Sequence, residues 1–553
     1  MPIVTIPRRI LLATLSIILI VFAWIWWNRP QQADLAGYVP ASSLVYLECN
    51  NLSDVADAMT GTESWNKLKP FIGESTNSWT SVRSRQLMAF TGFGPTAGVI
   101  LARAQVAMIM LDLGAREEGD TITLKPEAAL LIETHTSEGR IRSTVEEALS
   151  KFADRSYGQP TFKRTEMDGD DFLIWISPNN NRQIVATIDG SLVIVANSER
   201  AVSACLAARR GQRPNLLTDP ELQPMRATIS ANKALAFGFV SSSHTAELLS
   251  VSAPVLFGRA PESAQFDRLI ANSAPKILAS AGWTARAADR AIEDHYFFAL
   301  QPSVATRMRP LFQPIPQSSV LNLVPKDVHS LTMYRFQEPV QTWRGLQTTL
   351  SSQLDTLSSI LMVSILKSAL LPNGVADPER FLGLVGPEMM TARLKPDSTG
   401  SILIARVRDE SGLRELLKST PEKSHDEPER ELATHFQDGY VLMGSPVDIQ
   451  ECVRSLAQSN SSPLNLPHYG ADSSSANIVT YSKDGQRVRN FIAAIARAQG
   501  KPIASESAQL EHVVDQVPYS TTETSLTEKG LDRRTRSAFG QFGALVALLF
   551  PGD

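Results

Sequence analysis

Two short motifs pair a serine with a lysine at the spacing at which an amine can activate a hydroxyl group. Ser64 precedes Lys67 and Ser364 precedes Lys367, so both segments match Ser-x-x-Lys. Serine-reactive enzymes of the penicillin-binding type also need Ser-Asp-Asn and Lys-Thr-Gly elements, and the chain contains neither. We therefore interpret both motifs as parts of helix surfaces.

Two other segments have the composition of a ligand-binding loop. The stretch from Gly92 to Gly98 is rich in glycine, but its third glycine comes one residue too late for a dinucleotide fingerprint. Pro95 also removes an N–H group that a phosphate would need. The acidic stretch from Asp168 to Asp171 lacks the alternating ligands and distal glutamate of a calcium loop. The sequence predicts a turn before a strand for the first and a hairpin tip for the second.

Histidines are dispersed along the chain. No two of them stand four residues apart, and neither His-Glu-x-x-His nor Gly-x-Ser-x-Gly occurs. A catalytic triad assembled only in the folded chain stays open, but no motif points to one. The sequence therefore predicts no catalytic, cofactor-binding or metal-binding residue, and no cofactor. The eight histidines are His135, His244, His295, His329, His425, His435, His468 and His512.

The three cysteines, Cys49, Cys205 and Cys452, are too few and too far apart for a disulfide framework. An exported chain meets an oxidising compartment, so one pair could still form. We prefer to interpret them as buried small hydrophobic residues. With no Cys-x-x-Cys pair or His/Cys cluster, a zinc or redox site has little support.

The composition is that of a globular protein. Of 553 residues, 43% are hydrophobic and 20% are charged, which excludes a disordered stalk. The 53 Lys and Arg residues nearly balance the 57 acidic ones. This balance gives no electrostatic reason to expect a nucleic-acid partner, which requires a concentrated basic face.

The residues from Ile10 to Trp27 form an uncharged run that predicts a membrane helix. Its 18 residues would span roughly 27 Å at about 1.5 Å per residue, close to the hydrocarbon core of a bilayer. Three tryptophans crowd its C-terminal end, where indole rings favour the headgroup level; they are Trp24, Trp26 and Trp27.

The flanking charges predict the orientation of this helix. Arg8 and Arg9 precede the run and only Arg29 follows it, which places the N-terminus in the cytoplasm. The alternative is a cleaved signal peptide, whose apolar region is usually shorter and ends at small residues. We expect a tail at 1–9, an anchor at 10–27 and a large part outside the cytoplasm, held at the cytoplasmic membrane.

Passages of similar sequence recur in the same order along the extracytoplasmic part. Val39-Pro40 and Val324-Pro325 each open a strand-like passage, and Asp189-Gly190 and Asp438-Gly439 each precede a serine and then a helix with a cysteine. The order predicts two diverged tandem domains at 28–300 and 320–553, joined by a proline-rich link at 301–319. The spacing is longer in the first copy, so we expect an extra segment within 70–125.

Within the first copy, short β-prone runs alternate with turn residues. The runs Phe162–Met167, Phe172–Ile176 and Ile184–Ile188 are separated by Asp-Gly and Asn-rich turns, which predicts an antiparallel meander. Ser198 then starts a helix over 201–209 with one apolar face. Strands followed by a helix, without regular alternation, favour an α+β fold of antiparallel sheet with packed helices. The apolar segment 539–550 is too short to span a bilayer, so we expect it to pack on the second domain.

The opening from Val39 to Leu47, the Asp189-Gly190 pair and the passage from Ser198 to Val202 carry a family likeness. Together they resemble a bacterial membrane-anchored family known as DUF3352, although Ser42 stands where that family often has Asp. The resemblance implies an exported, anchored bacterial protein, and it carries no catalytic residue across because the family has none established.

These observations lead us to expect a non-enzymatic binding or scaffolding module of the bacterial envelope with a possible envelope protein partner. Two alternatives are an envelope hydrolase whose site lies between the two domains and a carrier of an apolar ligand. The sequence leaves the oligomeric state open.

Overall fold

The computed structural model describes residues 32–72, 104–118, 121–245, 273–315, 320–354, 370–418, 432–458, 476–498 and 508–549, apart from a few single positions in or beside these ranges. The predicted anchor at 10–27 and the glycine-rich stretch 92–98 lie outside the described residues. Among the helices that are described, none has the length and apolar character needed to cross a bilayer.

Strands and helices alternate irregularly along the whole described chain. The first part contains η1 (Leu35–Tyr38), β1 (Val45–Cys49), α2 (Leu52–Thr60), α3 (Glu63–Ile72), β2 (Gln105–Glu118), β3 (Thr121–Glu133), α6 (Glu138–Tyr157), β4 (Thr161–Met167), β5 (Asp170–Ile176), β6 (Gln183–Asp189), β7 (Leu192–Ala196), α7 (Glu199–Arg209), η2 (Leu216–Thr218), α8 (Leu222–Thr228), η3 (Ala231–Lys233), β8 (Ala236–Val240), β9 (Leu278–Ala288), β10 (Ala291–Leu300), α11 (Pro302–Met308) and η4 (Arg309–Leu311).

The second part contains η5 (Val320–Leu323), β11 (Ser330–Arg335), α12 (Pro339–Ser351), η6 (Leu371–Asn373), α14 (Pro378–Leu384), β12 (Val385–Arg393), β13 (Ile402–Val407), α15 (Glu410–Lys418), β14 (Ala433–Gln437), β15 (Tyr440–Gly444), α16 (Pro446–Gln458), β16 (Ile478–Ser482), α17 (Gly485–Ala498), α18 (Ala508–Asp515), β17 (Ser520–Leu526), β18 (Gly530–Ser537) and α19 (Gly540–Leu549).

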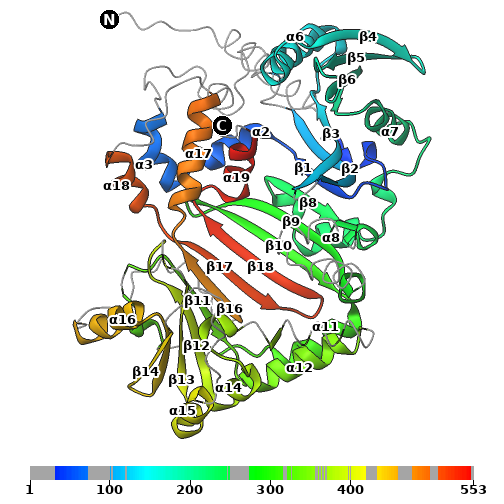
Figure 1. Ribbon diagram of the computed structural model, residues 1–553. Coiled ribbons are helices and arrows are strands. Elements are labelled where there is room, and N and C mark those ends of the chain that lie inside the picture. The colour runs from blue at the N-terminus through cyan, green and yellow to red at the C-terminus, as the bar shows by residue number, and fades with distance from the viewer. Residues whose placement is uncertain are drawn as a thin grey trace, which may run out of the picture.

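All 18 described strands belong to one antiparallel sheet, which runs through the molecule (Figure 1). Followed from neighbour to neighbour, the order is β4-β5-β6-β7-β3-β2-β1-β8-β9-β10-β18-β17-β16-β11-β12-β13-β15-β14. Helices pack on the sheet without regular β-α-β crossovers. The predicted α+β class with an antiparallel sheet is therefore confirmed.

The same strand order occurs twice within this sheet. The series β6-β7-β3-β2-β1-β8-β9-β10 corresponds one to one with β14-β15-β13-β12-β11-β16-β17-β18. The two series meet at their equivalent last strands, which pair antiparallel from Ile292 opposite Ser537 to Ala299 opposite Gly530. Because these two strands are equivalent and antiparallel, a local two-fold axis relates them. The two halves are therefore joined edge to edge in the middle of the sheet.

The extra length of the first half lies elsewhere than the sequence suggested. We expected it within 70–125, yet β1 and β2 start almost as far apart as β11 and β12 do. The difference arises after β3, where α6 has 20 residues against 9 in α15. Among the residues that the structure describes, the β4–β5 hairpin also has no counterpart in the second half. The expected position was therefore wrong: the first half is longer because of α6 and the β4–β5 hairpin.

The turn and cap residues adopt the conformations that their types favour. Asp168 and Gly169 both have positive φ values at the β4–β5 turn, as do Asp438 and Gly439 at the β14–β15 turn. The predicted meander β4-β5-β6 is therefore confirmed. Ser198 accepts a hydrogen bond from the Ala201 N–H at 3.0 Å and caps α7. Its counterpart Ser445 accepts the Asp448 N–H at 3.1 Å and caps α16.

The two halves also share a hydrophobic core, because helices of the second half pack on strands of the first. Phe491 on α17 lies 4.2 Å from Phe539, measured between ring centroids, and it also packs against Trp65 of α3. Phe542 on α19 lies 6.1 Å from the Trp283 ring on β9. The apolar segment that begins at 539 therefore packs on both halves, and not on the second half alone as expected.

The proline-rich segment 301–319 is not the loose link that its composition suggested. Residues 302–311 form α11 and η4, with Pro302 at the first helical position, where a proline fits. Val304 and Ala305 are buried, and α11 packs on α12. Pro302 and Pro310 each start a short helix here, whereas the sequence analysis interpreted the prolines as the mark of a link between the copies.

The three cysteines are free thiols. Cys205 and Cys452 are fully buried under the sheet on the equivalent helices α7 and α16. Burial raises the pKa of each of the three thiols to about 12. Cys205 and Cys452 therefore behave as small buried hydrophobic side chains, which was the preferred interpretation, whereas Cys49 is only partly buried, beside the shared core.

Candidate functional site

Ser64 and Lys67, the Ser-x-x-Lys pair that the structure describes in full, do not form a reactive group. Ser64 and Lys67 share α3, but Ser64 is buried while the Lys67 ammonium donates to the Gln516 carbonyl at 3.0 Å and pairs with Glu63 at 2.8 Å. This lysine is therefore not placed to activate the serine. Ser364 lies outside the described residues. Asp170, in the acidic stretch, forms a two-pronged ion pair with Arg210 at 2.8 and 2.6 Å, which fits a hairpin tip.

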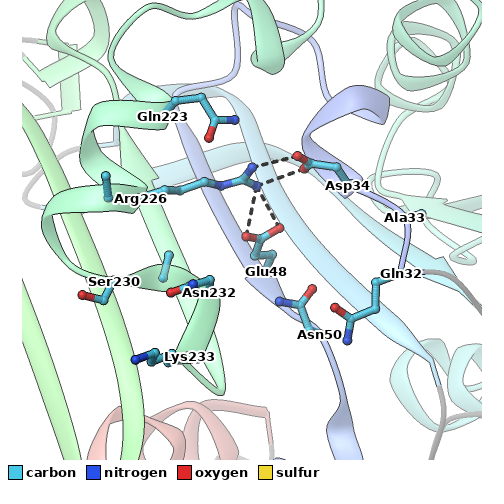
Figure 2. A pocket seen from close by; sticks show the side chains of 12 residues that line it. Gln32, Ala33, Asp34, Glu48, Asn50, Gln223, Arg226, Ser230, Asn232 and Lys233 are labelled. Carbon is cyan, nitrogen blue, oxygen red and sulfur yellow. Dashed lines mark hydrogen bonds and ion pairs between the residues drawn. The ribbon is translucent and has the colours of Figure 1, made fainter.

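The candidate site is a polar hollow of about 680 Å³ between the start of the described chain and α8. Figure 2 shows Arg226 and the η3 residues on one side, Gln32 to Asp34 on the other, and Glu48 and Asn50 of the β1 region between them. Its full lining is Gln32, Ala33, Asp34, Glu48, Asn50, Gln223, Arg226, Ala227, Ser230, Ala231, Asn232 and Lys233.

Arg226 connects the two walls of the hollow. Its guanidinium donates to both carboxylate oxygens of Asp34, at 2.8 and 3.0 Å. The same group donates to Glu48 at 3.1 and 3.3 Å. Its carbon atom lies 5.4 Å from the ring centre of Phe237, within the range of a cation–π contact. A planar guanidinium with five donors suits this double carboxylate contact, which a lysine could not reproduce.

The Arg226 contacts with Asp34 and Glu48, which we call the strap network, rest on side chains that are almost fully buried. Glu48 is 8% exposed, and it accepts a hydrogen bond from the Tyr46 hydroxyl beneath it. Burial raises the pKa of Glu48, while Arg226 and the Tyr46 hydroxyl oppose that shift. Burial and the neighbouring Glu48 charge raise the pKa of Tyr46. Burial works against the charge of Arg226, but its bonds to Asp34 and the charge of Glu48 outweigh this and raise its pKa.

Residues 32–39, which we call the strap, are tied to the sheet beside this network. The Ala33 N–H donates to the Gln105 side chain at 2.8 Å, and the Gln105 amide donates back to the Ala33 carbonyl at 3.0 Å. Leu35 and Val39 are fully buried in the first core. The strap is therefore an integral part of the fold.

The hollow is better suited to hydrogen bonding than to bond breaking. Both of its carboxylates are held by Arg226, and its lining contains no histidine or cysteine. Four of the nine other lining residues carry side-chain amides, each of which offers donors and an acceptor together. Among the described residues, no group of three or more metal-ligating side chains gathers at a common point.

A second polar contact, which crosses the seam between the halves, involves a histidine noted in the sequence. His295 on β10 lies 2.9 Å from Asp532 on β18. Arg534 also contacts Asp532, at 3.2 Å. The Thr284 hydroxyl, opposite His295 in the register, is buried without a hydrogen-bond partner among the described residues. Within the part of the chain that the structure describes, the pair is therefore not extended to a hydroxyl group as a hydrolytic triad would be.

The sequence reading missed Asp34, Glu48 and Arg226. Arg226 stands 178 positions after Glu48, and no local pattern connects the three residues. The repeat gave no signal either, because these charges belong to the first half alone. Comparison of the chain with family models, with curated proteins and with solved structures gave no match.

Proposed function

We propose that this chain is a membrane-tethered extracytoplasmic binding protein of the bacterial envelope, without enzymatic activity. The anchor at 10–27, the inner-membrane location and the DUF3352 resemblance are part of this proposal, and they rest on the sequence. The hollow beside the strap is its proposed binding site. The observation that supports this choice is an open hollow lined by four side-chain amides, in which Asp34 and Glu48 are both paired with Arg226.

The two halves, 28–300 and 320–553, are proposed to be diverged copies of one ancestral unit. The repeated strand order and the matching helix caps support this origin. The continuous sheet and the shared core mean that the copies act as one body. A rigid body of this kind suits a scaffold, because a partner bound at one end is held at a set position relative to the other.

The envelope hydrolase with a site between the halves stays an alternative. The His295–Asp532 pair favours it, because the pair crosses the seam and is shielded from solvent. Its missing hydroxyl and its contact with Arg534 speak against it. A His295→Gln variant that loses a hydrolytic activity of the intact protein would favour this alternative over binding alone.

Localisation tests the first part of the proposal. The full chain with a C-terminal tag should stay in the membrane pellet after carbonate washing, and protease added to spheroplasts should digest the tag. A soluble chain, or a mature chain beginning near Gln31, would contradict the anchor. For binding, hydrogen exchange of the detergent-extracted protein should slow in strap and η3 peptides when envelope extract is added, but not in the β14 peptide. An equal slowing of hydrogen exchange in the β14 peptide would count against the hollow as the binding site.

A further inference from the structure

The strap sets how far the hollow can lie from the membrane. The Ala33 backbone is held by two hydrogen bonds, and Leu35 and Ala36 are buried, so the fold fixes the position of the chain from Ala33 onward. Only five residues separate Trp27, at the end of the proposed anchor, from Ala33. Because an extended chain covers at most about 3.5 Å per residue, the hollow lies within roughly 20 Å of the bilayer surface.

The charges of the hollow do not select an anionic headgroup. Arg226 is neutralised twice, by Asp34 and by Glu48. Lys233 is exposed, and a single exposed cation contributes little to binding a phosphate in water. With two acids and two bases in the lining, the formal charge of the hollow is balanced. An uncharged ligand fits this arrangement better than a phospholipid headgroup does.

The amides of the hollow match the groups of a peptide backbone. Gln32, Gln223 and Asn232 line it, and among the described residues their side chains make no hydrogen bond. Each can give an N–H and accept at its oxygen, as a peptide unit requires. The lining holds no aromatic ring on which a sugar or base could stack.

The strap itself shows this mode of recognition. Gln105, which is 1% exposed, holds the backbone N–H and carbonyl of Ala33 at the same time, and its amide also donates to Asn50 at 3.1 Å. At the edge of the hollow, a side-chain amide thus already forms hydrogen bonds with both the N–H and the carbonyl of a backbone segment. A second extended segment beside the strap would meet the amides of Gln223 and Asn232 in the same way.

We infer that the hollow binds an uncharged, extended peptide segment of a neighbouring membrane protein, at the point where that protein leaves the bilayer. This inference rests on the proposed tether, and it adds the chemistry and the place of the partner.

Photo-crosslinking in intact membranes of the native host tests this partner. A photoreactive amino acid replaces Lys233, and a control replaces Val447 on α16, which is 71% exposed and belongs to the other half of the sheet. We expect adducts at Lys233 whose partner peptide maps within about ten residues of a membrane span. We also expect Asn232→Ala, combined with the Lys233 probe, to lower the yield about five- to tenfold, as one lost hydrogen bond predicts.

The possible outcomes separate the two proposals. Adducts at Lys233 with lipid alone, with soluble proteins alone, or at the yield of the Val447 control would overturn the peptide inference while leaving the tether standing. An unchanged yield with Asn232→Ala would do the same. If the chain is absent from the washed membrane pellet, the tether fails first, and the partner inference falls with it. Asn232 is exposed and makes no described bond, so its substitution leaves the fold intact.

Discussion

Replacement of Arg226 by alanine should expose how strongly the strap network depends on one guanidinium. The substitution leaves Glu48, 8% exposed, without its cation. Breaking a buried pair by removing one partner costs about 3 kcal/mol or more. Loss of the ion pair with Asp34 adds less than about 1 kcal/mol to this cost, because the Asp34 side chain is 41% exposed and stays solvated. We expect the free energy of unfolding to fall by about 3–4 kcal/mol.

This cost depends on pH, because Glu48 can take up a proton instead of staying charged. Without Arg226, burial raises the pKa of Glu48 further above its unfolded value. The folded state then favours the protonated form, so stability is retained at low pH and lost as the pH rises through the raised pKa. The difference in the free energy of unfolding between the Arg226→Ala variant and the parent protein should therefore be smaller at pH 5 than at pH 7.5. Adding Glu48→Gln should recover about 2 kcal/mol at pH 7.5, because no charge is then left buried.

Urea unfolding of the detergent-extracted chain, followed by tryptophan fluorescence, measures these differences. The matched control is Arg309→Ala, which removes an ion pair with Glu528 whose side chains are 60% and 68% exposed. We expect this control to change the unfolding free energy by less than about 0.5 kcal/mol. The reasoning is refuted if Arg226→Ala costs no more than the control, or if Glu48→Gln fails to recover stability in the double variant.

The remaining predictions concern the seam, the shared core and the thiols. Asp294 is 2% exposed and its pKa is raised to about 6, so its contribution to stability is present below pH 3.8 and lost as the pH rises through 6. Between pH 4 and pH 7 the unfolding free energy should fall by up to about 3 kcal/mol from this group, and Asp294→Asn should flatten that part of the curve. Gly530→Ala should cost more than about 3 kcal/mol in a urea titration, because its Cβ would collide with the β10 backbone. In the control Gly139→Ala in α6, the added Cβ meets no neighbour, so we expect the free energy of unfolding to rise by about 1 kcal/mol. A similar loss of stability in the Gly530→Ala and Gly139→Ala variants would contradict the reasoning. Cys205 and Cys452, with pKa values of about 12, should react with a thiol reagent only after unfolding; labelling of the native protein would contradict their burial.

The shared core has a consequence for how the protein unfolds. Ile292 and Trp283 of the first half pack against α17 and α19 of the second. Neither half can keep this core without the other, so the two halves should unfold together. A tandem pair of separate domains, as the sequence suggested, would instead unfold in two steps.

Local features of this fold could be read from the sequence because they depend on neighbouring residues. Asp-Gly pairs adopt the positive φ values of tight turns, a serine before a helix accepts its orphan N–H, and alternating runs form paired strands. The Val-Pro and Asp-Gly passages, which recur in the same order, indicated a repeat for the same reason, because equivalent strands keep equivalent turns and caps. These signals predicted the α+β class, the meander and the buried cysteines.

Only the tertiary structure decided how the two halves meet and where a site lies. Nothing local in β10 or β18 marks them as partners, because a strand pairs through backbone groups that every residue carries. That pairing turned two expected domains into one sheet with a common core. The hollow depends on Asp34, Glu48 and Arg226, which come from three separate segments of the chain and meet only in the folded protein. The sequence by itself therefore determined the elements and their repetition, while the long-range contacts determined the seam and the site.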